Sequence, residues 1–388
     1  MFLLDLTHTS HTRARTGIQR VSRALHAALT TTGTAAAVTW DPYAHQWRTL
    51  DDWETQNLLS SAPSSHRGAH WPWSAQLRGH RRQWLRLPPT LPAAAEGLIV
   101  PELFSAQTAA ALPGLMARVR GPRVAIFHDA IALKYPELSP AKTVARFPAY
   151  LEELLAFDGI AAVSADSRDS LIDYWRWLGV TQTPPVIALP LGLEKAHASR
   201  ASAPASLPPV LLSVGTIEGR KNHLALLTAC EQLWAQGHVF TLQLIGLAHP
   251  LTGRAALDRI RTLQAVGRPL RYDGAVDEAA LRQAYSHCTF TVYPSLIEGF
   301  GLPVLESLSY GKPCICSGRG ALGESSREGG CLALAQVDAA SIAAAIDRML
   351  TAPGELERLA TAASSRHFRA WSEYATELTT WLKSLPRR

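Results

Sequence analysis

The sequence predicts an α/β protein made of two doubly wound domains that face each other across a cleft. In the second half of the chain apolar strands alternate with amphipathic helices, and the first half repeats this pattern less regularly. Such alternation is typical of parallel sheets with helices on both faces. A length of 388 residues fits two domains. Between the halves, residues 199–209 (SRASAPASLPP) have the composition of a linker, which places the boundary near residue 205.

The second half shows the clearer succession of elements. Residues 210–215 (VLLSVG) form an apolar run typical of a buried strand, and residues 222–236 have helical spacing closed by Gly237. Cys314 and Cys316 alternate in the last apolar run and are expected on one face of a strand. The further elements expected here are strands at 240–246, 270–272, 288–295 and 313–317, and helices at 255–265, 277–286 and 303–310.

The first half opens with an apolar strand at residues 1–7 (MFLLDLT), followed by a helix at residues 18–29. The remaining elements expected in the first half are strands at 123–129, 159–167 and 186–192, with a helix running from the second of these to residue 178. The last segment of the chain, residues 368–385, is amphipathic and places Trp371, Tyr374 and Leu378 near one stripe. Such a helix needs an apolar surface to cover.

Composition excludes several classes of protein. With 47% hydrophobic and 18% charged residues, the chain is not disordered. No stretch of 18 uncharged residues occurs, so a membrane-spanning helix is not expected. The opening residues lack a basic cluster and contain Asp5, which argues against a signal peptide. Five cysteines without CxxC spacing are typical of reduced thiols, and we therefore expect a cytoplasmic protein.

The net charge of +6 is small and spread over the chain. Residues 1–200 carry 20 basic and 16 acidic side chains, and residues 201–388 carry 18 and 16. This distribution is unlike the basic stripe of a nucleic-acid-binding protein, so no nucleic acid partner is expected. It is compatible with an anionic small ligand or an anionic membrane surface.

The sharpest motif is EGFGLPVLE, in which Glu298 and Glu306 flank a glycine-rich turn after an expected strand. Gly299 and Gly301 free the backbone to approach a ligand, and Pro303 suits the first turn of a helix. The start of that helix offers unpaired N–H groups for a phosphate, with Glu306 close enough to bind an attached ribose. Glu298 would face the sugar side. The alternative is that Glu306 only stabilises the helix dipole from the first turn and that Glu298 is an ordinary loop carboxylate.

A second motif, SVGTIEGRKNH, ends the first strand of the second domain. Arg220 and Lys221 stand just before a helix with Asn222 as its expected cap. A forked guanidinium beside a point charge suits a diphosphate. The alternative is a solvated basic turn.

EGFGLPVLE together with VGTIEGRKN resembles the family-four retaining glycosyltransferases, the group typified by bacterial mannosyltransferases and sucrose-type synthases. The resemblance implies the GT-B fold, with two Rossmann-like domains at 1–204 and 205–370 and a closing helix at 371–388 that crosses back to the first domain. It implies transfer with retention of configuration, a nucleotide sugar as substrate, no metal and no tightly bound cofactor. The other segments that carry it are RTGIQRVSRAL (15–25), FHDAIALKYPE (127–137), VSADSRDSL (163–171), ALPLGLE (188–194), DGAVDEAALRQAYSHC (273–288) and FRAWSEYATELTTWL.

The resemblance also implies roles for individual residues. Arg220 and Lys221 would neutralise the leaving diphosphate, Glu298 would hold sugar hydroxyls, and His128 would lie beside the anomeric carbon as a further catalytic residue. The implied donor-binding set is Gly17, Gly215, Arg220, Lys221, Glu298, Gly299, Phe300, Gly301, Leu302 and Glu306. Two departures from the family pattern are Glu218-Gly219 in place of Glu-Pro, which should loosen that loop, and the irregular segment 317–334, which puts nucleobase contacts in doubt.

The first choice of donor is GDP-mannose, because HDAIALKYPE is most similar to the mannosyltransferase branch; dTDP-rhamnose and UDP-hexoses remain open. The expected acceptor is a growing surface polysaccharide or its lipid-linked precursor. The alternatives are a sugar synthase or phosphorylase with a soluble acceptor, and a non-catalytic nucleotide-sugar-binding protein. The sequence has no DxD pair beside an apolar strand and no His/Cys/Asp spacing typical of a metal site.

A literal GxGxxG at Gly318, Gly320 and Gly323 could indicate a dinucleotide site, with Asp338 downstream. Only residues 324–330 precede the next apolar run, which is too short for the crossover helix that such a site requires. We therefore do not expect NAD binding.

Residues 40–84 hold six of the eleven tryptophans, and basic residues interleave with them. One interpretation is a packed insertion with a solvated basic face. The other is an interfacial segment that meets anionic lipid or a lipid-diphosphate acceptor, which would make the protein peripheral on the inner face of the cytoplasmic membrane. The residues concerned are Trp71, Trp73, Arg78, Arg81, Arg82, Trp84 and Arg86.

Overall fold

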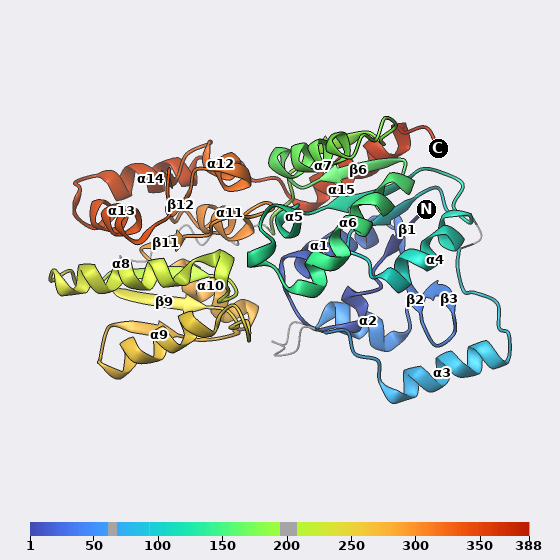
Figure 1. Ribbon diagram of the computed structural model, residues 1–388, viewed down its shortest axis with the longest axis horizontal. Coiled ribbons are helices and arrows are strands. Elements are labelled where there is room, and N and C mark those ends of the chain that lie inside the picture. The colour runs from blue at the N-terminus through green and yellow to red at the C-terminus, as the bar shows by residue number, and fades with distance from the viewer. Residues whose placement is uncertain (61–67, 93, 195–207, 388) are drawn as a thin grey trace. The chain divides into compact units, whose positions relative to one another are not determined.

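The computed structural model describes residues 1–60, 68–92, 94–194 and 208–387, and the chain divides into two compact units (Figure 1). Unit 1 contains Met1–Gly192 together with Arg369–Arg388, and unit 2 contains Leu193–Phe368. The expected boundary near residue 205, and most of the expected linker around it, lie outside the described residues.

Unit 1 is built on a seven-stranded sheet with the order β3-β2-β1-β4-β5-β6-β7. All neighbouring strands are parallel except β3, which pairs antiparallel with β2. The structure thus confirms the predicted α/β class, and an antiparallel strand lies at this edge of the sheet. The physical reason is the short connection between β2 and β3, which turns the chain back as a hairpin and places His45 at a φ of 50°. The strands are β1 (Phe2–Asp5), β2 (Ala35–Asp41), β3 (Gln46–Thr49), β4 (Leu98–Val100), β5 (Arg123–Phe127), β6 (Gly159–Ala162) and β7 (Val186–Ala188).

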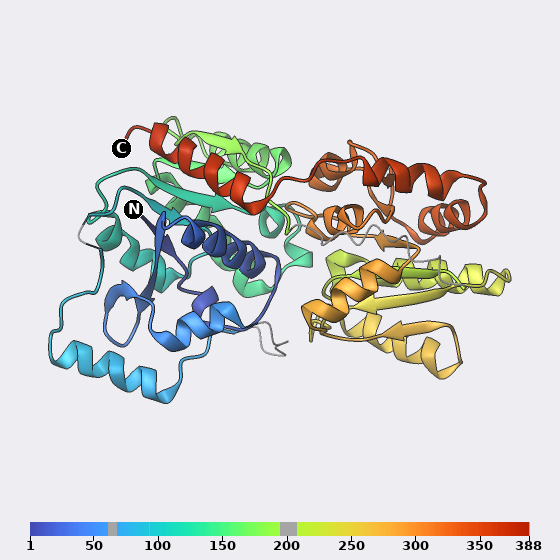
Figure 2. The ribbon, with the colours of Figure 1, turned by 180° about the vertical axis from the view of Figure 1, so that it is seen from behind.

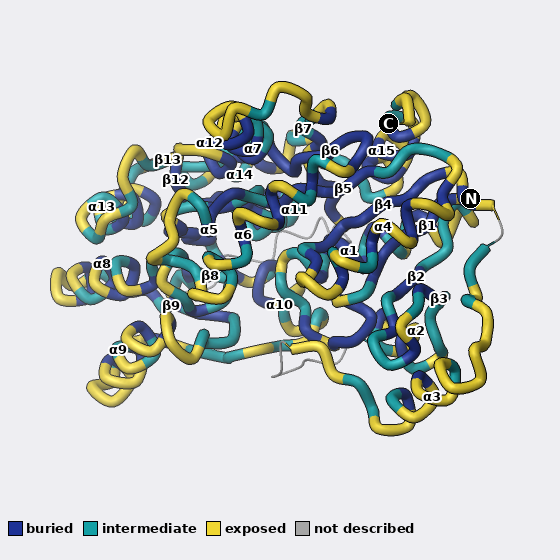
Figure 3. Tube along the Cα trace, turned by 45° about the vertical axis from the view of Figure 1, so that its right-hand side comes forward, coloured by how far each residue is buried: buried dark blue, intermediate teal, exposed yellow. Residues whose placement is uncertain are grey.

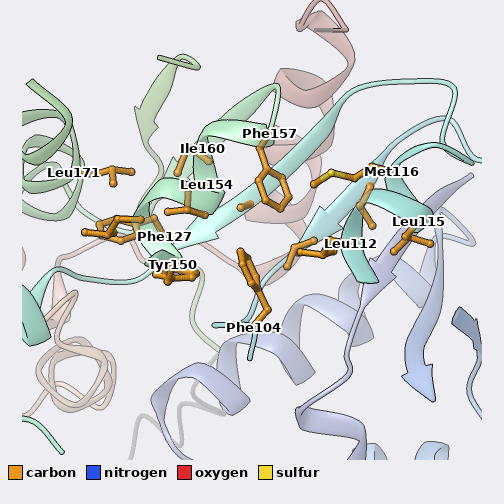
Figure 4. Packing of buried hydrophobic residues seen from close by; sticks show 14 of the residues in the cluster. Phe104, Leu112, Leu115, Met116, Phe127, Tyr150, Leu154, Phe157, Ile160 and Leu171 are labelled. Carbon is orange, nitrogen blue, oxygen red and sulfur yellow. The ribbon is translucent and has the colours of Figure 1, made fainter. Parts of the chain in front are cut away.

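The largest core of unit 1 lies on the sheet around β4, β5 and β6. Phe104, Phe127, Tyr150 and Phe157 are buried there with Leu112 of α4 (Figure 4). The helices of the unit are α1 (Gly17–Thr31), α2 (Asp52–Leu59), α3 (Trp73–Trp84), α4 (Ala106–Met116), α5 (Ile131–Lys134), α6 (Ala141–Glu153), α7 (Ala165–Trp177) and α15 (Trp371–Ser384), with the 3-10 turns η1 (Thr9–His11), η2 (Pro136–Leu138) and η3 (Leu154–Ala156).

Helix α15 completes unit 1, although it follows unit 2 in the sequence. It packs beside α1 (Figure 2). A Cβ atom added at Gly97 would lie 2.8 Å from Leu382, and one added at Gly159 would lie 2.7 Å from the Trp381 ring. The glycines thus allow α15 to approach the chain just before β4 and at the start of β6.

Unit 2 contains a fully parallel six-stranded sheet with the order β10-β9-β8-β11-β12-β13. Each element expected in this half is confirmed, with ends that differ by one or two residues. The strands are β8 (Val210–Val214), β9 (Thr241–Ile245), β10 (Leu270–Tyr272), β11 (Phe290–Tyr293), β12 (Cys314–Ser317) and β13 (Cys331–Leu334). The helices are η4 (Gly219–Lys221), α8 (His223–Ala235), α9 (Arg254–Ala265), α10 (Glu278–His287), α11 (Leu302–Ser309), α12 (Gly320–Ser326), α13 (Ala339–Thr351) and α14 (Glu355–Ser364).

Two details of unit 2 bear on the sequence interpretation. Cys314 and Cys316 are buried in the same apolar cluster, which confirms that they share one face of β12. Helix α12, which includes Gly320 and Gly323, is seven residues long. The GxGxxG sequence is therefore followed by the short connection that we expected.

The strand orders identify where a ligand would bind in each unit. In unit 1 the direction of chain progression reverses between β1 and β4, and in unit 2 it reverses between β8 and β11. In open α/β sheets, ligands bind at the carboxyl ends of the strands next to such a switch point. The loops that follow these four strands are therefore the first places to look for a site. No helix in the described part of the chain combines the length and apolar character needed to cross a bilayer.

Candidate active site

In unit 2 the two sequence motifs meet at the switch point. The loop after β8 carries Arg220 and Lys221, and the loop after β11 carries Glu298. The backbone N–H of Leu296 donates to the carbonyl of Arg220 at 2.8 Å, and Ser295 Oγ donates to the same carbonyl at 3.3 Å. Because β8 and β11 are neighbouring parallel strands, the loops at their carboxyl ends lie side by side despite a sequence separation of 78 residues.

The carboxylate of Glu298 is buried and lies at the centre of this site. Its Oε2 accepts a hydrogen bond from Arg220 Nη1 at 2.7 Å. Its Oε1 accepts one from the Tyr293 hydroxyl at 2.9 Å and also contacts Lys221 Nζ and Ser295 Oγ. Arg220, Lys221 and Glu298, predicted from separate motifs, therefore form one ion-pair cluster.

The cluster holds Glu298 in its charged form. Burial by itself would raise the pKa of Glu298, but Arg220 and Lys221 outweigh it and lower that pKa to about 2. Burial lowers the pKa of Lys221, an effect that Glu298 only partly offsets. For Arg220, burial is outweighed by Glu298 and by Glu218, whose carboxylate accepts from Arg220 Nε at 2.8 Å, so the pKa of Arg220 is raised.

Charge neutrality in the cluster has a chemical consequence. Two cations, Arg220 and Lys221, face two carboxylates, Glu218 and Glu298, so the group carries no formal net charge. A dianionic ligand would bind by replacing a carboxylate as the partner of one or both cations. The released carboxylate of Glu298 would then be available to accept hydrogen bonds from hydroxyl groups.

Tyr293 and Gly215 complete the surroundings of Lys221. The ammonium of Lys221 lies 4.7 Å from the centre of the Tyr293 ring and contacts its hydroxyl. A Cβ atom added at Gly215 would lie 3.8 Å from both Lys221 Cε and the Tyr293 ring. Gly215 therefore lies beside the Lys221 side chain, at the end of β8.

Asn222 precedes α8 as expected, but it does not cap the helix with its side chain. Its Nδ2 instead donates to the carbonyl of Val337 at 2.6 Å. The residue adopts a left-handed conformation with a φ of 56°. Asn222 is therefore the N-cap residue of α8, as predicted, while its side-chain amide holds the loop to Val337.

Helix α11 begins after the glycine-rich turn. Gly301 has a φ of 97°, and a Cβ atom there would lie 2.6 Å from Leu322, so a larger residue would be both strained and crowded. Leu302 is the first residue of the helix, Phe300 packs on the apolar cluster beneath it, and Gly299 precedes Phe300 in the turn. The carbonyl of Phe300 already accepts from Ser325 Oγ at 2.8 Å.

Glu306 lies beyond the first turn of α11, which contains no acidic residue. The interpretation of Glu306 as a first-turn dipole partner is therefore wrong. Its Oε2 accepts from the hydroxyl of Tyr285 at 3.0 Å, and Tyr285 stacks on Tyr310 with ring centres 5.3 Å apart. Helix α10 thus orients this carboxylate through Tyr285.

In unit 1, His128 follows β5 and is buried. Its Nε2 is 2.7 Å from the carbonyl of Pro101, so Nε2 must be the nitrogen that carries the proton. Burial lowers the pKa of His128 and favours the neutral ring. In that form Nδ1 can only accept a hydrogen bond, for instance from a sugar hydroxyl.

Gly17, the other predicted residue of unit 1, is exposed at the start of α1. A Cβ atom added there would have no neighbour within 4 Å. The packing of unit 1 therefore does not itself require glycine at this position. The helix start is fixed by Thr16 and Gln19, whose backbone and side chain form a capping box.

Two buried carboxylates at the switch point of unit 1 were not predicted as site residues. Asp5, at the end of β1, accepts from the backbone N–H of Thr7 at 2.9 Å and from its hydroxyl at 2.6 Å. Glu102, just after β4, accepts from the backbone N–H groups of His8 and Thr9 at 2.8 and 2.9 Å. The sequence did contain an indication of Asp5, because a charged residue within an apolar strand is unusual.

Burial raises the pKa of Asp5 to about 7, with a further contribution from Glu102. In the unfolded chain this carboxyl ionises near pH 3.8, so the folded protein binds an additional proton between these values. The stability that depends on the protonated form is therefore present at low pH and lost as the pH rises toward 7.

Replacement of Asp5 by asparagine should remove this pH dependence, because the amide is neutral throughout. We expect the unfolding midpoint of Asp5→Asn to increase relative to that of the wild type as the pH rises from about 5 to about 7. Above that range the difference between the two midpoints should stay constant. Thermal unfolding of both proteins across this range measures the effect. A difference that stays constant from pH 5 upward would contradict the assignment.

The described part of residues 40–84, the tryptophan-rich segment, contains β3, α2 and α3. Arg82 pairs with Asp51 at 2.7 Å, and Arg78 lies 3.6 Å from the same carboxylate. Both arginines thus help to hold α3 on the unit, whereas Arg81, Trp84 and Arg86 are exposed. Two of the four arginines therefore have an acidic partner, and the other two are exposed.

In the part of the chain that the structure describes, no group of three or more His, Cys, Asp or Glu side chains could hold a metal ion. All five cysteines are free thiols.

Comparison with known proteins places this site in context. Residues 195–366 match the family of glycosyl transferases group 1. The serotype-specific mannosyltransferase WbdA of Escherichia coli is 25% identical over 343 residues, which cover 81% of this chain and 38% of WbdA. O-antigen chain mannosyltransferase B of Escherichia coli is 30% identical over 213 residues, covering 50% of this chain and 52% of that protein. The chain thus spans about 38% and 52% of the lengths of these curated relatives.

Among solved structures, the sucrose-phosphate synthase from Thermosynechococcus elongatus superposes with a TM-score of 0.70 and 19% sequence identity, over 98% of each chain. This likeness shows the GT-B fold. The ion-pair cluster at the β8–β11 switch point lies within the residues that match the family. The match to the glycosyl transferases group 1 family therefore lies in unit 2, within a chain that has the GT-B fold.

Proposed function

We propose that the protein is a retaining glycosyltransferase that moves a hexose from a nucleotide sugar to a glycan or lipid-linked saccharide. The observation that carries the proposal is the Arg220–Lys221–Glu298 cluster at the ligand-binding edge of a glycosyl transferases group 1 domain. The half-buried Arg220 and the buried Lys221 at that edge suit a nucleoside diphosphate. The names of the relatives, two mannosyltransferases, support mannose as the sugar. GDP-mannose is the donor that we propose for it.

In this proposal the donor diphosphate replaces Glu298 as the partner of Arg220 and Lys221. The cations then stabilise the negative charge that develops on the leaving diphosphate as the bond to the sugar breaks. Glu298, oriented by Tyr293 and Ser295, accepts hydrogen bonds from sugar hydroxyls. His128 accepts a further one through Nδ1.

The proposal includes no metal and no bound cofactor. The charge that a divalent cation would neutralise in a diphosphate is met here by Arg220 and Lys221, both of which are fixed by hydrogen bonds. The acceptor we propose is a surface polysaccharide or its lipid-linked precursor, in keeping with the name of the O-antigen relative. The reaction would take place in the cytoplasm, where reduced cysteines are expected.

A synthase with a soluble sugar phosphate as acceptor is the second candidate. The full-length superposition with a sucrose-phosphate synthase favours it, since the likeness extends over both units. Acceptor screening separates the two candidates. A sugar phosphate that accelerates nucleotide release more than any oligosaccharide would favour the synthase.

Donor turnover by the purified protein tests the proposal. We expect release of GDP from GDP-mannose to exceed nucleotide release from UDP-hexoses and dTDP-rhamnose, and to persist in excess EDTA. Glu298→Gln should lower turnover by about a hundredfold while nucleotide affinity is retained, because the neutral amide cannot replace a preorganised carboxylate. Glu357→Gln, an exposed carboxylate in the same unit, is the matched control.

Three results would contradict parts of the proposal. A product of inverted anomeric configuration by NMR would exclude retention. Activity abolished by EDTA and restored by Mn²⁺ would mean that a metal stabilises the leaving group. Nucleotide-sugar binding without turnover of any donor, with every acceptor, would favour a non-catalytic binding protein.

A further inference from the structure

Helix α3 lies at the outer edge of unit 1 and packs on it through small residues (Figures 1 and 3). Only Ala75 and Gly79 are buried within the helix. A Cβ atom at Gly79 would lie 2.5 Å from Tyr43 Cβ, so the helix backbone approaches the β2–β3 turn directly. The large side chains of α3 therefore lie on the side of the helix that faces away from unit 1.

Those large side chains are apolar and exposed. Trp73, Leu77 and Trp84 are 75%, 49% and 83% exposed, and their spacing of four and seven residues places them along one stripe of the helix. Leu85 and Leu87, which follow the helix, are 43% and 46% exposed. We refer to these five residues as the α3 face. Exposed apolar groups gathered in this way mark an interaction surface.

The charged residues of α3 and of the chain on either side of it all have one sign. Residues 68–95 contain four arginines and no acidic residue. Arg78 and Arg82 form ion pairs with Asp51. Arg81 and Arg86 are exposed and have no ion pair with any residue that the structure describes. The free cations thus border the apolar stripe on a helix without carboxylates.

We propose that the α3 face docks unit 1 on an anionic lipid surface. A helix with Trp and Leu on one side, Arg beside them and no acidic residue has the composition of helices that lie in the membrane interface. Tryptophan rings favour the headgroup boundary, and arginines are attracted to anionic headgroups while their stems contact the acyl chains. The inference does not depend on the proposed reaction.

The same contact would fix the β1–α1 loop relative to the bilayer. Trp71, just before α3, packs its ring 4.1 Å from that of His11 in η1, and the backbone N–H of His70 donates to the carbonyl of His11 at 2.7 Å. His11 in turn binds Glu54 at 2.7 Å. A docked α3 is therefore rigidly connected to the loop that leads to Gly17.

Co-sedimentation of the full-length protein with vesicles tests the proposal. We expect binding to vesicles of equal parts phosphatidylglycerol and phosphatidylcholine at about 50 mM salt, weaker binding at about 500 mM, and little binding to phosphatidylcholine alone. Arg81→Ser with Arg86→Ser should lower the partition coefficient about 25-fold, since each arginine near an anionic surface contributes about fivefold. Trp73→Ala with Trp84→Ala should abolish the binding that remains at high salt.

Matched controls come from the same unit. Arg118→Ser with Arg120→Ser makes the same change of charge at exposed positions on another surface, and Trp177→Ala removes a tryptophan that is 78% exposed on α7. These variants should bind vesicles like the wild type, and unfolding midpoints should confirm that all variants are folded. Equal loss of binding in the control variants, or a wild type that binds neither vesicle at low salt, would overturn the proposal.

Discussion

Replacing Lys221 with alanine is expected to reduce turnover about a hundredfold. The ammonium lies against Glu298 and Tyr293 at the switch point of unit 2, where a departing diphosphate would gain negative charge. Loss of one such preorganised charge costs about 3 kcal/mol of transition-state stabilisation, which corresponds to roughly a hundredfold in rate. Arg220→Ala should have an effect of the same size for the same reason.

The fold should survive the Lys221 substitution. Glu298 keeps Arg220, Tyr293 and Ser295 as partners, so its carboxylate is not left unpaired. The measurements are steady-state kinetics with a saturating donor and the unfolding midpoint, with Lys142→Ala as the exposed control. If Lys221→Ala and Arg220→Ala both turn over at nearly the wild-type rate, the leaving diphosphate is stabilised elsewhere.

The largest loss of stability is expected from Arg48→Ala. Arg48 is only 1% exposed, and its guanidinium binds Asp41 Oδ2 at 2.8 Å and both oxygens of Glu54 at 2.7 and 2.9 Å. Removal of the arginine leaves two buried carboxylates without their main cation. Breaking a buried ion pair in this way costs about 3–5 kcal/mol of unfolding free energy.

Arg48 also explains the charge state of its partner. Burial would raise the pKa of Glu54, but His11 and Arg48 outweigh it and lower that pKa to about 2. Urea unfolding of Arg48→Ala measures the loss, and Arg254→Ala, which removes an arginine from the surface of α9, is the control. Arg48→Lys should recover only part of the stability, because an ammonium cannot form the two-pronged contact with Glu54. A loss below about 1 kcal/mol would show that the network relaxes or admits water.

The sequence was sufficient to predict unit 2 because its strands and helices alternate with regular spacing. The motif residues Glu298, Arg220 and Lys221 could be placed at strand ends, but their mutual contacts could not. Those contacts depend on β8 lying next to β11, and no spacing within either motif contains the strand order. Tyr293 was read as part of an apolar strand, where a buried tyrosine that binds a carboxylate has the same pattern as one that only packs.

Unit 1 was predicted less completely for related reasons. The strands β2 and β4 are short or rich in alanine, and β3 returns antiparallel through a tight turn. Asp5 and Glu102 come together only because β1 pairs with β4 across more than 90 intervening residues. The tryptophan-rich segment was visible in composition, but the division of its arginines between Asp51 and solvent is a matter of helix orientation.

The return of α15 to unit 1 has a consequence for how the chain is made. Unit 2 is one uninterrupted segment, whereas unit 1 is closed by residues on both sides of it. During synthesis the sheet of unit 1 leaves the ribosome first, yet Tyr374, Leu378 and Leu382, which are buried in the finished protein, follow only after unit 2. At 5–20 residues per second that interval lasts on the order of 10–35 s. Through this time the nascent first unit carries an uncovered apolar surface that chaperones would recognise, and unit 2 can reach its native state before the unit that precedes it.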